Sequence, residues 1–177
     1  MAADLCCDYS PSHQQVMTTQ QQIANDALFI KEVDSFTGLC FTTRATLPQL
    51  SRYYKAVAED LYTEAARLSL DINGPIQWIY TDVNGDPTNE FQLEIVLPIR
   101  QSGAEPRGFT YRTFEPFRCL SYTHTGDWSE LMGIYDALFP ALYGMGYQND
   151  GRVREIYAVI DFEKPTNNVT EIQIHLV

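Results

Sequence analysis

Residues 151–177, which read GRVREIYAVIDFEKPTNNVTEIQIHLV, decide the fold of this chain. Two apolar runs, 156–162 and 172–177, flank a turn-rich segment. This pattern is typical of a β-hairpin. Glu155 and Glu171 stand where the two runs begin. In antiparallel strands joined by such a loop, we expect both carboxylates to face the same side of the sheet.

The hairpin has a counterpart earlier in the chain. A shift of 77 positions places GPIQWIY, residues 74–80, on GRVREIY, residues 151–157. The same shift aligns, without a gap, Trp78 with Glu155, Tyr80 with Tyr157, and Glu94 with Glu171. It also aligns the two segments with helical spacing. Agreement over a helix and two strands indicates an internal duplication, and two copies suit one domain with a pseudo-twofold axis.

Each half of the chain shows the same order of elements. Apolar strand signals, an amphipathic helical segment and a hairpin follow one another at 27–46, 53–70 and 76–99, and again at 109–125, 127–142 and 151–177. We therefore predict an α+β fold, a duplicated strand–helix–strand–strand repeat with an antiparallel sheet and helices on one face. We expect the opposite face to form a central ligand cleft whose floor comes from both hairpins.

The length of 177 residues is enough for one domain with a sizeable core. Residues 1–26 are polar, and we interpret them as an N-terminal extension. Residues 27–177 then form a single domain, with repeat one at 27–100 and repeat two at 109–177. Between the repeats, 101–108 is a linker rich in Gly, Pro and charge.

The composition excludes several classes of protein. A net charge of −11 argues against a broad basic face for nucleic acid, so we expect no direct nucleic-acid binding. The charge is compatible with cationic ligands. No apolar run approaches the roughly 20 residues of a membrane span, so we expect no membrane segment. The N-terminus lacks the basic and apolar regions of a secretory signal, which predicts a cytoplasmic protein.

The metal-ligating residue types show no ligand spacing. Adjacent Cys6 and Cys7 with two distant cysteines do not match a zinc site, and the three histidines form no pattern. We interpret Cys40 and Cys119 as small buried apolar residues. Motifs for Ser/His/Asp catalysis, phosphate loops and dinucleotides are absent from the sequence. We therefore predict no metal and no cofactor.

The carboxylates Glu155 and Glu171 are the strongest candidates for a functional site. Each could be a solvent-facing residue on a half-exposed strand. Both flank apolar residues, however, and an unpaired charge in a half-buried cleft is costly. A protein keeps such a charge for cation binding or for acid–base chemistry. Glu94, the counterpart of Glu171, is either structural or part of the lining of the site.

Four aromatic residues are candidates for ligand contacts: Tyr80, Tyr157, Tyr122 and Trp78. Packing in the core or across strands is one interpretation. The other is an aromatic wall, since ring faces attract cations and flat apolar ligands. A tyrosine hydroxyl could in addition donate a hydrogen bond.

The segments 74–80, 94–98, 119–126, 155–157 and 169–174 resemble the GyrI-like superfamily, the effector-binding domain of multidrug-sensing transcription regulators. The resemblance runs from about residue 28 to the C-terminus. It implies two strand–helix–strand–strand repeats around a cleft, where an acidic residue meets cationic aromatic ligands. Glu155 matches the ligand-contacting glutamate of some members, and Glu171 matches the glutamate of the last strand. The chain departs from the regulators because it shows no DNA-binding domain.

The resemblance leaves several functions open. The first is a stand-alone module that binds a small hydrophobic or cationic ligand. The second is a hydrolase, similar to members that open strained electrophilic rings, with Glu155 and Glu171 as the base and acid that activate water. The third is a gyrase-inhibitor-like module with a protein partner, or a homodimer. A haem-binding role is the least favoured, because no histidine stands in a ligand position.

Overall fold

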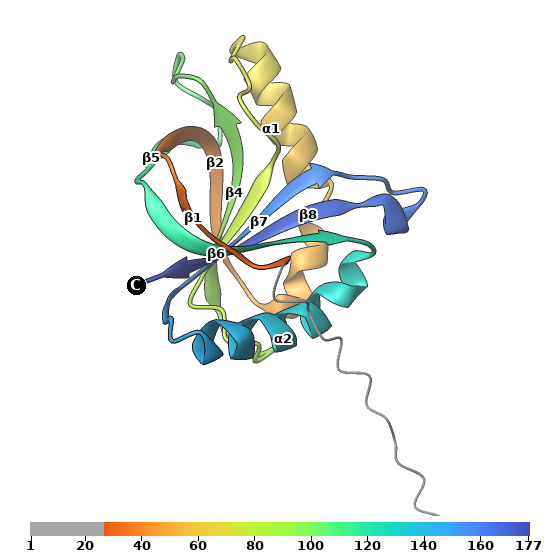
Figure 1. The fold of residues 1–177 in the computed structure, drawn as a ribbon. Helices are drawn as coiled ribbons and strands as arrows, with labels where there is room; N and C mark the ends of the chain where they lie inside the picture. Colours follow the sequence, from red (N-terminus) through yellow and green to blue (C-terminus); the bar gives the residue numbers. More distant parts are fainter. Residues whose placement is uncertain (1–26) are drawn as a thin grey trace, which may run out of the picture.

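The computed structural model describes residues 27–177 as an α+β fold (Figure 1). The predicted N-terminal extension, with Cys6 and Cys7, lies outside the described residues. The strands are β1 (Phe29–Val33), β2 (Phe36–Ala45), β3 (Gln77–Thr81), β4 (Phe91–Ile99), β5 (Thr110–Phe114), β6 (Phe117–Thr125), β7 (Asn149–Val159) and β8 (Val169–Leu176). The helices are α1 (Ala56–Arg67) and α2 (Leu131–Gly144), with short 3-10 helices at Leu47–Arg52 (η2), Trp128–Glu130 (η3) and Pro165–Asn167 (η4).

All eight strands of the described chain form one antiparallel sheet in the order β1-β6-β8-β7-β3-β4-β2-β5. From the central pair outward, β3-β4-β2 on one side corresponds to β7-β8-β6 on the other. In that central pair Trp78 lies directly opposite Glu155, the residue with which the 77-residue shift aligns it. The predicted antiparallel α+β architecture is confirmed, whereas the internal duplication stays a prediction.

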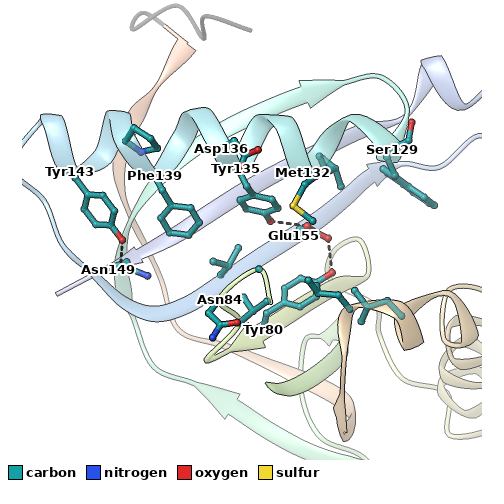
Figure 2. A pocket seen from close by; sticks show the side chains of 18 of the residues that line it. Tyr80, Asn84, Ser129, Met132, Tyr135, Asp136, Phe139, Tyr143, Asn149 and Glu155 are labelled. Carbon is teal, nitrogen blue, oxygen red and sulfur yellow. Dashed lines mark hydrogen bonds between the residues drawn. The ribbon is translucent and has the colours of Figure 1, made fainter. Parts of the chain in front are cut away.

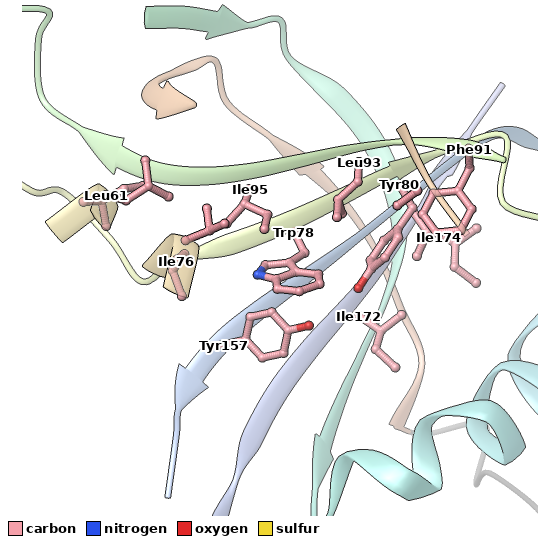
Figure 3. Packing of buried hydrophobic residues seen from close by; sticks show 14 of the residues in the cluster. Leu61, Ile76, Trp78, Tyr80, Phe91, Leu93, Ile95, Tyr157, Ile172 and Ile174 are labelled. Atoms are coloured by element: carbon pink, nitrogen blue, oxygen red, sulfur yellow. The ribbon is translucent and has the colours of Figure 1, made fainter. Parts of the chain in front are cut away.

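The main core lies between the sheet and both helices. Val57, Leu61 and Ala65 of α1 and Ile134, Leu138 and Leu142 of α2 belong to one buried cluster with the inward residues of the strands. Figure 3 shows its centre, where Trp78 and Tyr157 lie among Ile76, Ile95 and Ile172. Burial of such side chains contributes about 1.5–3 kcal/mol each. Both helices therefore cover the same face of the sheet, as predicted.

The sheet must curl strongly at one end because of its connections. β1 and β2 are separated in the sheet by five strands, yet only Asp34 and Ser35 join them. In a flat sheet six strand spacings would be about 29 Å. The three Cα steps of the connection reach at most about 11 Å. β5 and β6 are also separated in the sheet by five strands, yet only Glu115 and Pro116 join them. The two edges of the sheet must therefore approach each other.

This curl encloses the face of the sheet that points away from the helices, which we call the far face. Phe36 and Phe114, from β2 and β5, stack with ring centroids 4.7 Å apart, and Phe117 of β6 stacks on His175 of β8 at 3.7 Å. Cys40 and Cys119 are also on this face and are buried, as predicted. Burial raises the pKa of the Cys40 thiol to about 12, so it is not a reactive thiolate near neutral pH.

His175 makes the stability of the fold dependent on pH. Burial, followed by the charges of Arg154 and Arg152, lowers the pKa of His175 from 6.5 to about 4, against a weaker opposing effect of Asp150. Between those two values the unfolded chain binds a proton that the folded chain does not, so stability falls as pH falls. We expect this group alone to remove about 2–3 kcal/mol between pH 7.5 and pH 4.5.

Urea denaturation of the wild type and of His175→Phe at both pH values measures this contribution. Phenylalanine keeps a flat ring against Phe117 but cannot take up a proton. The variant should therefore lose about 2–3 kcal/mol less than the wild type over the same pH interval. An identical loss in both proteins would rule out His175 as the titrating group.

Three local features differ from the sequence pattern. Leu47–Arg52 forms the 3-10 helix η2, and α1 spans only Ala56–Arg67 of the helical segment expected at 53–70. α2 passes through Pro140 and continues to Gly144, two residues beyond the helical segment expected at 127–142. The predicted first strand segment of each repeat contains two strands, so that β1 and β5 add an edge to either side of the sheet. No helix within residues 27–177 has the length and apolar character needed to cross a membrane.

Candidate functional site

A pocket of about 720 Å³ lies between α2 and the sheet (Figure 2). This is the size range of small-molecule sites. It is lined by Leu47, Leu50, Tyr54, Tyr80, Val83, Asn84, Gly85, Trp128, Ser129, Leu131, Met132, Tyr135, Asp136, Phe139, Pro140, Tyr143, Asn149, Val153 and Glu155. The expectation that the cleft would form on the face opposite the helices is wrong. The pocket opens on the helix face, because α2 stands off the sheet and forms one of its walls.

Glu155 on β7 is the buried charge of this pocket. The residue is 5% exposed, and its carboxylate accepts hydrogen bonds from three tyrosine hydroxyls. Tyr80 and Tyr157 donate to Oε2 at 2.7 and 2.6 Å, and Tyr135 donates to Oε1 at 2.7 Å. A carboxylate has about four lone-pair sites. These contacts leave one acceptor position on Oε1.

The three hydroxyls act as donors over the whole physiological pH range. Burial, reinforced by the negative charge of Glu155, raises the pKa of Tyr80, Tyr135 and Tyr157 well above the usual value for a phenol. Hydrogen bonds from neutral donors stabilise the carboxylate but do not cancel its charge. Within residues 27–177, Glu155 forms no ion pair with a lysine, arginine or histidine.

The wall formed by α2 carries a row of aromatic rings. Tyr135, Phe139 and Tyr143 recur at intervals of four residues, and successive ring centroids are 6.2 and 6.1 Å apart. Tyr135 and Phe139 were not among the aromatic candidates identified from the sequence, yet both line the pocket. The sequence did contain a signal for this second row, because Ile134, Leu138 and Leu142 already form a complete buried row on the helix. Adjacent rows at spacing four lie on neighbouring faces of a helix.

The predicted aromatic residues have different positions. Tyr80 lines the pocket. Tyr157, two residues after Glu155 on β7, is buried and donates a hydrogen bond to it. Trp78 is 2% exposed and stacks on Tyr54 with centroids 4.9 Å apart, so it belongs to the core behind the pocket. Tyr122 is half-buried against the main core and is not among the pocket-lining residues of the described chain. Ligand contacts by any of these residues stay predictions.

The prediction that Glu155 and Glu171 face the same side of the sheet is wrong. In the β7–β8 register Glu155 lies opposite Ile172, and Glu171 lies opposite Ile156. Residues that lie directly opposite share a face, and neighbours along a strand alternate. Glu171 is therefore on the far face. There it contacts Lys31 at 2.5 Å and accepts hydrogen bonds from Ser121 and Gln173.

Glu94 is also on the far face, where it pairs with Arg112 of β5. Glu94 and Glu171, which the 77-residue shift aligns, thus both lie away from the pocket. The predicted base-and-acid pair of Glu155 and Glu171 is not brought together. Pocket chemistry that involves a carboxylate depends on Glu155, with Asp136 as the other acidic residue of the lining. No cluster of metal-ligating side chains occurs in the described part of the chain.

Comparisons with solved structures show the same fold in proteins of low sequence identity. The crystal structure of the EcmrR C-terminal domain has a TM-score of 0.70 at 15% identity, covering 85% of this chain and 96% of that one. The structure of SAV2435 bound to tetraphenylphosphonium has a TM-score of 0.61 at 14% identity, covering 85% and 93%. A hydrolase from Listeria innocua has a TM-score of 0.63 at 15% identity, covering 85% and 91%.

The EcmrR chain in a complex with DNA also has this fold, with a TM-score of 0.71 and 16% identity. The match covers 84% of the present chain and 56% of that longer chain. A comparison with curated protein sequences gave no significant match. The family model described as the GyrI-like small molecule binding domain matches residues 28–177. The chain belongs to the GyrI-like family of small-molecule-binding domains.

Proposed function

We propose that this domain binds bulky aromatic cations in the pocket between α2 and the sheet. Glu155 is the counter-charge for the ligand. The observation that carries the proposal is its environment, a buried carboxylate inside a pocket, held by three neutral hydroxyls and paired with no cation of the described chain. Burying a charge without an opposite charge is costly. A ligand cation that enters this pocket offsets that cost.

The lining of the pocket suits a ligand with its charge surrounded by apolar surface. Aromatic side chains from α2, η3 and β3 line it, and none of its described lining residues is basic. A cation over a desolvated ring face gains about 2 kcal/mol. SAV2435, which shares the fold, is bound to tetraphenylphosphonium. That cation has the properties expected here, which makes it a suitable first probe.

A pair of probes with the same shape and opposite charge tests the proposal. Tetraphenylphosphonium and tetraphenylborate present nearly the same four phenyl rings. We expect the phosphonium to bind at least about 100-fold more tightly, because a single unit charge near Glu155 is worth a few kcal/mol in a partly buried site. Isothermal titration calorimetry measures both affinities. Equal affinity, or tighter binding of the borate, would exclude Glu155 as a counter-charge.

Binding without turnover is the function that the geometry favours. Of the two carboxylates considered for a hydrolase, Glu171 lies on the far face, so the pocket holds Glu155 without this partner. Interaction with a protein partner such as gyrase, a homodimer and a cytoplasmic location stay predictions from the sequence.

A further inference from the structure

The far face carries a second buried charge, Arg154, directly next to Glu155 on β7. Arg154 is 2% exposed. Its guanidinium carbon lies over the rings of Phe117 and Phe36, at 4.3 and 4.7 Å from their centroids, and 5.9 Å from that of Phe114. These are the rings that the curl of the sheet brings together. They shield the faces of the guanidinium from water, whereas its N–H donors lie in the plane of the group.

Arg154 is the unbalanced cation of this face. Its side chain makes no hydrogen bond and no ion pair within residues 27–177, and its Nε is buried without a partner. The neighbouring carboxylates already have their own cations: Glu94 pairs with Arg112, Glu171 with Lys31, and Asp150 with Arg152. Burial lowers the pKa of Arg154 to about 10, so the group is still charged at neutral pH.

Other buried polar atoms without partners surround Arg154. Gln173 lies directly opposite Arg154 in the β7–β8 register, and its Oε1 has no hydrogen bond. Gln77 on the neighbouring strand β3 and His175 on β8 also have buried unpaired atoms on this face. Buried polar groups in folded proteins are nearly always satisfied. Three such residues around one unpaired cation therefore indicate a binding site rather than a chance defect of packing.

We propose that Arg154 binds a small monoanion of the carboxylate class on the far face. A planar carboxylate can accept two parallel N–H bonds from the in-plane edge of a guanidinium, which the phenyl rings leave uncovered. One negative charge balances the one unpaired positive charge. A ring N–H of His175 supplies a further donor to the anion, whereas the unpaired Oε1 atoms of Gln77 and Gln173 are acceptors and do not contact it. The site goes beyond the proposed cation pocket and is separated from it by the sheet.

Thermal unfolding of the full chain in sodium acetate, sodium chloride and sodium phosphate at matched ionic strength tests this site. A ligand that binds only the folded state raises Tm in a saturable way. We expect acetate at ten times its dissociation constant to raise Tm by about 4 °C. Chloride should give less, because it lacks the planar pair of oxygens. Phosphate should also give less, because the site balances a single charge.

Two variants control the measurement. Arg154→Met keeps a long side chain against Phe36 and Phe117 but has no charge, and it should lose the acetate-specific rise. Arg100→Met removes a surface guanidinium that pairs with Asp71, and it should keep the rise. A rise of the same size for all three salts, or its survival in Arg154→Met, would overturn the proposal.

A second measurement covers the case in which Arg154→Met does not fold. The Nε–H resonance of Arg154 in the wild-type protein should shift saturably with acetate in ¹⁵N-resolved NMR, and Arg154→Lys assigns that resonance by its loss. An unshifted resonance at saturating acetate would overturn the proposal. None of these results depends on the cation pocket, because every assay uses an anion alone.

Discussion

Glu155→Gln should weaken the binding of tetraphenylphosphonium by on the order of 100-fold, or about 3 kcal/mol. Glutamine has nearly the same size as glutamate, so the shape of the pocket is kept. Its side-chain oxygen can still accept from the hydroxyls of Tyr80 and Tyr157. The variant therefore removes the charge and little else. Calorimetric titration of both proteins measures the difference.

Glu171→Gln is the matched control for this experiment. It is the same substitution on the adjacent strand, but Glu171 is on the far face with Lys31. We expect its affinity for the cation to stay within about twofold of the wild type, because the sheet separates the two groups and bulk solvent screens them. Equal weakening by both substitutions would show that the overall negative charge of the protein, rather than Glu155, attracts the ligand.

Trp78→Ala should lower the free energy of unfolding by about 4 kcal/mol, the usual cost of removing a large aromatic side chain from a core. For a chain of this size that corresponds to a fall in Tm of about 8–16 °C. Trp78 is 2% exposed, and its ring stacks on Tyr54 and meets Tyr157 edge-on at 6.1 Å. No small neighbour can refill so large a volume. Urea denaturation followed by circular dichroism gives the difference in stability.

Trp128→Ala supplies the comparison for Trp78→Ala. Trp128 is half-buried, lines the pocket, and donates its indole N–H to Thr170 at 3.1 Å. Its loss should cost less stability than the loss of Trp78 and should weaken ligand binding more. If Trp78→Ala were instead stable but unable to bind the ligand, Trp78 would be part of the aromatic wall of the pocket, as predicted from the sequence.

The architecture could be predicted because it depends on local signals. Two hairpins at equivalent places, each preceded by a helical stripe, are sufficient to specify an antiparallel sheet with both helices on one face. The resemblance to the GyrI-like superfamily, which the family model confirms, rested on the same segments. Glu155 was identified because a charge between apolar strand residues is unusual, and it does lie in the pocket.

The face of Glu171 could not be predicted because it depends on one irregularity in the hairpin. Near the loop, Val159 pairs with Val169. If that register continued, Glu155 would lie opposite Gln173 and share a face with Glu171. A shift between Tyr157 and Val159 moves the pairing by one residue, which exchanges the faces. Neither glycine nor proline marks this position in the sequence.

The adjacent charges of Arg154 and Glu155 also bear on how the chain finds its register while folding. A slip of β7 by one residue would turn every side chain of this central strand to the other face. Glu155 would then lie against the π-electron faces of Phe36 and Phe117, and Arg154 would enter the pocket in place of the carboxylate that the tyrosine hydroxyls bind. Both residues would lose their stabilising neighbours in the same misaligned state. The pair therefore acts as a built-in penalty against mispairing at the centre of the sheet, where the two halves of the domain join.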